Sequence, residues 1–244
     1  MQILQVIAHL MHYPSAEVSQ HQTDMAMLIS ESREISPDQR AELLALLNEI
    51  YDADLMDAQE EYGLLFDQGR SMSLHVFEHV HGESRDRGQA MVDLMSIYEQ
   101  NGFEMDSKEL PDYLPLFLEY LARQPDLIAR EWLADVGHII ARIGARLIER
   151  ESSYNHLFTA LLTIAGKPEL LASELVEVAG EEPDNTPEAL DKEWEEVAVT
   201  WGADNLSCPS MDNRNKAADA NLSQPLNLTD APQHYNPPVG VPAS

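Results

Sequence analysis

Apolar residues recur at helical spacing along most of this 244-residue chain, and this periodicity limits the folds that it can adopt. Strand signals are nearly absent, because no alternating apolar–polar run is bounded by an Asn-Gly or Asp-Gly turn. We therefore predict an all-α fold with a single helical domain over residues 1–202. The segment 203–244 has Tyr235 as its only aromatic residue and is rich in Asn, Pro, Ser and Asp, so we expect a disordered tail.

Four helices have recognisable starts or ends in the sequence. Ser36-Pro37-Asp38-Gln39 has the pattern of a capping box with proline at the first helical position, which predicts a helix from residue 37. A second helix is predicted from about Asp86 to Asn101, with Gly102 as its stop. A third is predicted from Asp126, with one long apolar face that reaches Leu147, and a fourth over 186–202.

Charge and cysteine content exclude several function classes. The chain has 43 Asp+Glu against 15 Lys+Arg, a net charge of -28, and such a surface repels nucleic acid and anionic lipid. One cysteine, Cys208, excludes an intramolecular disulfide and cysteine-rich metal sites, and indicates a reducing compartment. No stretch approaches the ~18 apolar residues of a membrane span, and no signal peptide is visible. We therefore expect a cytoplasmic protein without stable membrane insertion.

Histidines and carboxylates near residue 80 raise the question of metal chemistry. Glu78 and His81 form a Glu-x-x-His pair of the kind found in helical di-iron proteins, and the nearest second copy is the imperfect Asp135-x-x-His138. A helical di-iron or other metal enzyme using these four residues is therefore one alternative function. The other interpretation is a polar helix end turning into Gly82, and no nucleophile motif is present. We expect no metal site, no catalytic residues and no enzyme activity.

Two charged segments have structural explanations. The arginines of Ser84-Arg85-Asp86-Arg87 are expected to hold neighbouring carboxylates together, and Asp86 could cap a helix. Asp112 is expected to be the N-cap of a helix that has Pro115 at its third position, where no helical hydrogen bond is lost. Glu119 lies in the apolar run that follows, so it faces either solvent or a groove.

Methionines provide a surplus of flexible apolar side chains, which fill cores and also line grooves that accept apolar peptides. An acidic helical domain with a groove lined by methionine and aromatic residues would favour a basic amphipathic helix as its ligand. A generic acidic adaptor is a further alternative function. The methionines in helical segments are Met25, Met27, Met56, Met72, Met91, Met95 and Met105.

Three segments carry a resemblance to a known family. They are Tyr62-x-x-Leu65-Phe66-Asp67, the run His81-Gly82-Glu83-Ser84-Arg85-Asp86-Arg87-Gly88, and Glu109-Leu110-Pro111-Asp112-Tyr113-Leu114-Pro115. Through them, residues 1–201 resemble the nitrate reductase delta-subunit family, whose members are dedicated assembly chaperones of the wider TorD-like group. Asp184-Asn185-Thr186-Pro187-Glu188 is a further match, whereas the tail departs from the family.

The resemblance implies an all-helical bundle of the TorD-like type that binds another protein and catalyses nothing. Such chaperones bind the N-terminal peptide of the molybdenum-containing α subunit of nitrate reductase. They keep it competent for insertion of the molybdopterin guanine dinucleotide cofactor and an iron–sulfur cluster, and they delay its docking on the membrane subunit. The implied partners are that α subunit, the α–β complex and cofactor-delivery proteins, and the chaperone itself holds no cofactor.

Ten motif positions are expected to form the peptide-binding site. Their aromatic and leucine members would contact the apolar face of the leader, and their acids would meet its cations. In a second interpretation Asp86, Arg87 and Asp112 only hold the walls of the groove, and the sequence does not separate the two roles. The ten residues are Tyr62, Phe66, Glu78, His79, Asp86, Arg87, Asp112, Leu114, Glu119 and Tyr120.

Overall fold

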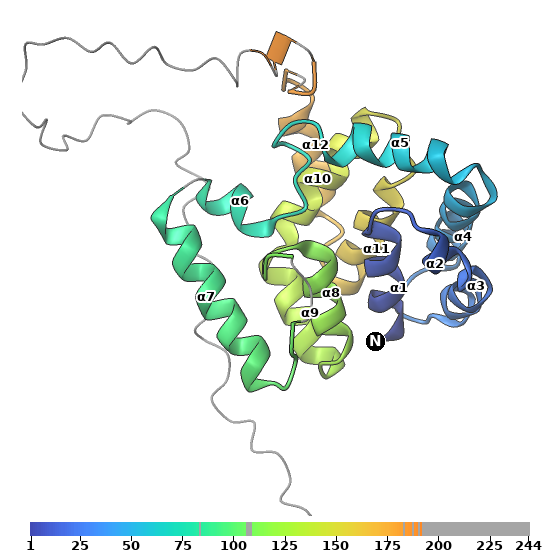
Figure 1. The fold of residues 1–244 in the computed structure, drawn as a ribbon, viewed down its shortest axis with the longest axis horizontal. Helices are drawn as coiled ribbons and strands as arrows, with labels where there is room; N and C mark the ends of the chain where they lie inside the picture. Colours follow the sequence, from blue (N-terminus) through green and yellow to red (C-terminus); the bar gives the residue numbers. More distant parts are fainter. Residues whose placement is uncertain (83, 106–108, 183, 187, 190, 192–244) are drawn as a thin grey trace, which may run out of the picture.

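The computed structural model describes residues 1–191 except 83, 106–108, 183, 187 and 190, and within them the fold is all helical. Their only extended pairing is an isolated antiparallel bridge between His75 and Tyr113. The all-α prediction is confirmed, whereas the predicted tail, 203–244, lies outside the described residues. The helices (Figure 1) are α1 (Gln2–Met11), α2 (Ala16–Ser19), α3 (Gln22–Glu31), α4 (Pro37–Asp52), α5 (Leu55–Phe66), α6 (Val76–His81), α7 (Arg85–Gln100), α8 (Leu114–Ala122), α9 (Asp126–Asp135), α10 (Gly137–Glu149), α11 (Asn155–Ala165) and α12 (Leu170–Val178).

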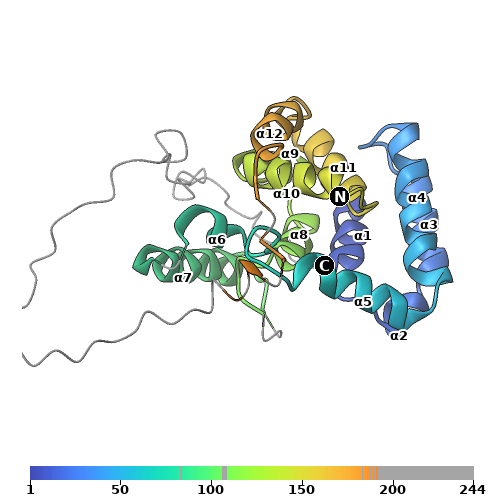
Figure 2. The same cartoon turned by 90° about the horizontal axis from the view of Figure 1, so that it is seen from above.

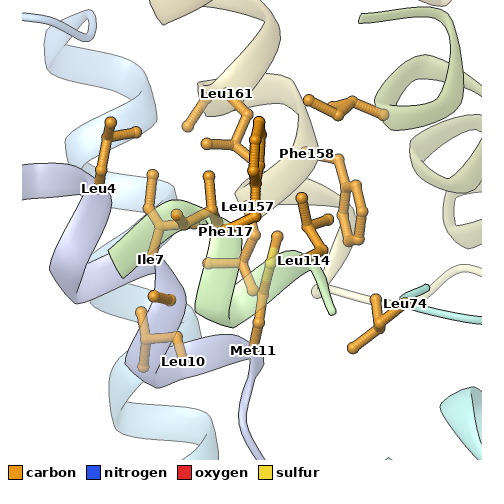
Figure 3. Close-up of a cluster of buried hydrophobic side chains, with 14 of the residues drawn as sticks. Leu4, Ile7, Leu10, Met11, Leu74, Leu114, Phe117, Leu157, Phe158 and Leu161 are labelled. Atoms are coloured by element: carbon orange, nitrogen blue, oxygen red, sulfur yellow. The ribbon is translucent and has the colours of Figure 1, made fainter. Parts of the chain in front are cut away.

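The hydrophobic core lies where α1, α8 and α11 meet, and the apolar side of α10 extends it. Burial of these side chains is the main source of folding free energy. Figure 3 shows the meeting point, where side chains from the three central helices interdigitate. They are Leu4, Ile7, Leu10 and Met11 of α1, Leu114 and Phe117 of α8, and Leu157, Phe158 and Leu161 of α11.

Two helical pairs flank this centre on opposite sides. Helices α3 and α4 lie on one side, and α6 with α7 forms an arm that projects from the other (Figures 1 and 2). The buried residues of α7 are Leu94 and Tyr98 alone, so this helix has few buried apolar side chains for its length. Its attachment is partly polar: the Tyr98 hydroxyl donates to the carbonyl of Pro111 at 2.9 Å. The arm is therefore anchored to the segment that precedes α8.

Two local capping signals locate helix ends correctly. The predicted capping box is present, because the Gln39 amide donates to Ser36 Oγ at 3.2 Å and the Ser36 amide donates to Gln39 Oε1 at 3.1 Å. Helix α7 confirms the second prediction, and Gly102 follows it with a φ of 70°. The fourth predicted helix lies mostly outside the described residues, but its expected start is visible where Thr186 Oγ1 accepts from the Ala189 amide at 3.1 Å.

The long third helix is two helices, so that prediction was wrong. Val136 ends α9 and begins α10 with φ of -95° and ψ of 7°, outside helical geometry. Gly137 follows, and a Cβ built there would lie 3.1 Å from the Leu170 side chain of α12. The break brings α10 close to α12. The apolar periodicity continues across the break, because α9 and α10 each bury the face on which the apolar residues recur.

Helices α10 and α11 approach closely at Gly144. A Cβ at this position would lie 3.0 Å from Phe158 Cβ, which is rigidly held in the core. We expect Gly144→Ala to lower the free energy of unfolding by about 1–3 kcal/mol, because overpacking must push the helices apart. Gly88 of α7 is the matched control, since a Cβ there meets nothing within 4 Å. Gly88→Ala should instead stabilise by up to about 1 kcal/mol, and urea unfolding that gave both variants the same sign would contradict this assignment.

Candidate functional site

A groove of about 470 Å³ opens between the end of α1, helices α5 and α6, and the segment before α8. Aromatic and acidic side chains dominate its lining, and one arginine is present. This combination suits a ligand with both apolar and cationic groups. The lining residues are Tyr13, Tyr62, Phe66, Asp67, Gly69, Arg70, Ser73, Leu74, His75, Glu78, Glu109 and Tyr113.

The aromatic part of the groove is rigid and uncharged. The ring of Tyr62 packs on Phe66 with centroids 4.8 Å apart and on Tyr13 at 5.5 Å, edge to face. The Tyr62 hydroxyl donates to the carbonyl of Met11 at 2.8 Å, which fixes α5 against the end of α1. Burial raises the pKa of Tyr62 and of Tyr113, so both phenols stay protonated at neutral pH. These side chains therefore offer a preformed apolar surface.

One wall of the groove is the connection between α5 and α6, residues 67–75, which we call the wall loop. Ser73 fastens it to α6: its hydroxyl donates to Glu78 at 2.6 Å, and its carbonyl accepts from His79 Nε2 at 2.7 Å. His79 is half-buried beside the loop and does not line the groove. Of these two predicted site residues, Glu78 thus faces the groove and also holds its wall.

Asp112 lies behind the groove, fully buried, and joins three segments. Its carboxylate accepts from the Phe77 amide at 3.2 Å, lies 3.3 Å from Nδ1 of His75, and pairs with Arg87 at 3.6 Å. The predicted N-cap role is wrong, because Tyr113 is the N-cap of α8 and Asp112 satisfies the first turn of α6 instead. The arginines of the 84–87 run were expected to hold neighbouring carboxylates together; Arg87 does pair with a carboxylate, but with that of Asp112, outside the run.

The remaining predicted residues occupy three different environments. Leu114 and Tyr120 are core residues, 1% and 2% exposed. Glu119 is half-buried and lies 3.3 Å from Nε2 of His12; that hydrogen bond is the main reason its pKa is lowered. Asp86 is exposed on α7. Of the ten predicted residues, Tyr62, Phe66 and Glu78 are brought together in the lining of the groove.

Sequence reasoning missed much of the lining. Asp67 and Tyr113 stand inside the quoted motifs beside residues that were chosen, so alternation of buried and exposed positions could have identified them. Glu109 also stands in a quoted motif, at its first position, whereas Tyr13 had no local signal. None of the seven methionines lines the groove, and Met25 and Met72 are buried in the core, which is the commoner use of this side chain.

The alternative metal centre has no support in the described part of the chain. Among its residues, no group of three or more His, Asp or Glu side chains is placed to hold a metal ion. Glu78 instead accepts a hydrogen bond from Ser73, and His138 lies on α10 beside Arg142 and Glu174. None of the described helices has both the length and the apolar character needed to cross a membrane.

Buried histidines make stability depend on pH. Burial lowers the pKa of His9, His79 and His138 in the folded protein below the ordinary 6.5. At pH values between the folded-state pKa and 6.5, the unfolded chain therefore binds more protons than the folded protein. Stability is therefore lost as the pH falls below 6.5. We expect His79→Gln to flatten this loss in urea unfolding measured across that range. His21→Gln is the control, because that ring is 71% exposed, and an equal flattening there would contradict the assignment.

Comparison with known proteins gives consistent matches. Residues 33–160 match the family described as nitrate reductase delta subunit. The chain is 44% identical over 233 residues to the nitrate reductase molybdenum cofactor assembly chaperone NarJ of Escherichia coli K12, covering 95% of this chain and 99% of that protein. It is 46% identical over 207 residues to the probable chaperone of the same kind, NarW, from that organism, covering 85% and 87%. A probable NarJ of Bacillus subtilis 168 is 37% identical over 103 residues, covering 42% and 56%.

Proposed function

This chain belongs to the nitrate reductase delta-subunit family, as its motifs predicted, and from that premise we propose that it is a chaperone for nitrate reductase assembly rather than an enzyme. We propose that the groove binds the N-terminal peptide of the α subunit. Holding that peptide keeps the α subunit competent for insertion of the molybdopterin guanine dinucleotide cofactor and an iron–sulfur cluster, and delays docking on the membrane subunit. The chaperone acts in the cytoplasm, on the α subunit alone or in the α–β complex, with cofactor-delivery proteins as further partners.

The observation that carries this proposal is the composition of the groove. Its four aromatic rings would bury the apolar side of a peptide helix, and Asp67, Glu78 and Glu109 would pair with cations on the polar side. A volume of about 470 Å³ accepts a short part of a peptide and no folded domain. The net charge of -28 would attract a basic leader from solution and speed encounter.

The direct test is a binding titration with a fluorescent peptide that copies the N-terminus of the α subunit. We expect saturable binding that an unlabelled copy displaces and that weakens as salt rises, because exposed charges contribute. A peptide with the same composition in scrambled order is the control, since it keeps the charge and loses the amphipathic face. Equal affinity for both peptides, or no binding of the native order, would contradict the proposal.

We also propose that residues 1–202 form one domain that folds without residues 203–244. The deleted segment has few large apolar side chains to add to the core. Truncation after residue 202 should change the free energy of unfolding by less than about 0.5 kcal/mol and leave peptide affinity intact. A large fall in the midpoint of thermal unfolding would show that the segment belongs to the folded domain.

A further inference from the structure

The wall loop is fastened at a second point, far from α6, by a residue near the end of the described chain. Asp184 accepts two hydrogen bonds from Ser71, one from its amide at 2.8 Å and one from its hydroxyl at 2.6 Å. Asp184 does not line the groove, whereas Gly69 and Ser73 on either side of Ser71 do. The carboxylate therefore acts on the groove wall from behind.

Gly69 shows independently how closely Asp184 approaches the loop. Its φ is 85°, a left-handed conformation that favours glycine, and a Cβ there would lie 2.6 Å from the Asp184 carboxylate. The backbone at this corner of the groove is thus shaped around the carboxylate. A loop that moved away from Asp184 would lose both the close packing and the two hydrogen bonds.

Arg146 of α10 and Arg150, the residue that caps the C-terminus of α10, hold this contact in place. Arg150 lies 3.3 Å from Asp184, while Arg146 pairs in two-pronged geometry with Glu181 at 2.6 and 2.8 Å and donates to the carbonyl of Ser71 at 2.6 Å. Partial burial would raise the pKa of Asp184, but the hydrogen bonds from Ser71 and from the Asp184 amide, together with the charge of Arg150, hold the pKa below the ordinary 3.8. The carboxylate is therefore ionised at neutral pH, as this arrangement requires.

We propose that Asp184 is a positioning residue for the groove: bonded to Ser71 and closely packed on Gly69, it fixes the wall loop in the conformation that binds peptide. This inference rests on the proposed function and deepens it. The segment that follows α12 thereby contributes to ligand affinity although it does not line the groove. It also gives a physical role to the Asp184-Asn185-Thr186 motif.

The test compares Asp184→Ala with Glu174→Ala in the full chain. Glu174 lies on α12 and pairs with Arg142 of α10 at 2.8 Å, so its variant removes a similar ion pair that does not touch the wall loop. We expect Asp184→Ala to weaken binding of the α-subunit leader peptide about tenfold, and Glu174→Ala to leave it unchanged. The more conservative Asp184→Asn keeps one acceptor oxygen and should retain intermediate affinity.

A double-mutant cycle of Asp184 with Ser71 distinguishes a positioning role of Asp184 from a general loss of stability. Once Asp184 is gone, Ser71→Ala should cost no further affinity, whereas Ser71→Ala in the wild type should weaken binding. Hydrogen exchange of the amides in 69–73 should speed up in Asp184→Ala while exchange in α8 stays the same. Additive losses, or unchanged affinity in Asp184→Ala while the wild type binds, would overturn this inference alone. A wild type that binds no peptide would overturn the proposed function and this inference with it.

Discussion

Asp112→Ala is expected to lower the free energy of unfolding by about 3–5 kcal/mol, because it removes the anionic partner of a buried ion pair. The Asp112 side chain is fully buried, and that of Arg87 is 18% exposed. The truncation would leave the Arg87 guanidinium without its carboxylate and the Phe77 amide without its acceptor. A loss of this size is a large part of the 5–15 kcal/mol that stabilises a typical domain.

The matched comparison uses Asp86, an acid of the other charged motif. Asp86 is exposed on α7, so Asp86→Ala should change the free energy of unfolding by less than about 0.5 kcal/mol. Asp112→Asn keeps an acceptor for Phe77 but loses the charge that faces Arg87, and it should fall between the two. Urea unfolding followed by circular dichroism measures all three. If Asp112→Ala were as stable as Asp86→Ala, the buried network would have no structural role.

The same variant is expected to act on the groove as well as on stability. The ring of His75 lies against the Tyr113 ring with centroids 5.5 Å apart, and Nδ1 of His75 is held by Asp112. Without the carboxylate, this part of the wall loses its orientation. Peptide affinity of Asp112→Ala should therefore fall even at temperatures where the variant is fully folded.

How far the sequence predicts this structure depends on how local each signal is. The capping box at Ser36 and the stop at Gly102 involve neighbouring residues, so sequence alone locates them. The break at Val136 depends on the approach of Leu170, which lies 34 residues along the chain, and periodicity does not reveal it. The N-cap prediction for Asp112 failed for a similar reason. An acid two residues before Leu-Pro is a good N-cap in isolation, but the first turn of α6 competes for its carboxylate.

The residues of the groove also divide into those with a local sequence signal and those placed by distant contacts. Tyr62 and Phe66 are one helical turn apart on α5, so a motif on that helix brings both to the groove. Tyr13 reaches it only because α1 packs against the end of α5, and Ser71 matters only because Asp184 returns from the far end of the fold. Family resemblance underlies the proposed ligand class, whereas the geometry of the wall depends on contacts between distant segments.

Reversing charge at the rim of the groove is expected to have the largest effect on peptide binding. Glu109 and Asp67 line the groove together with Tyr113. Burial, and then the negative charges of these two acids, raises the pKa of Tyr113. Both are exposed, so Asp67→Lys with Glu109→Lys should leave the fold intact. It would place two cations where we propose that a basic leader binds. We expect affinity to fall about 100-fold at low salt, because like charges at an interface cost several kcal/mol.

A second double variant distinguishes ion pairs between the groove and the peptide from the effect of the protein's total charge. Glu131→Lys with Glu177→Lys changes the net charge by the same amount at exposed positions on α9 and α12 that do not line the groove. It should slow association only a few-fold, because steering depends on the summed charge, whereas dissociation depends on contacts in the groove. Raising the salt should shrink the effect of both variants. Equal losses of affinity in the two double variants would show that the leader responds to the total charge of the protein, and the acidic rim would then have no specific role in recognition.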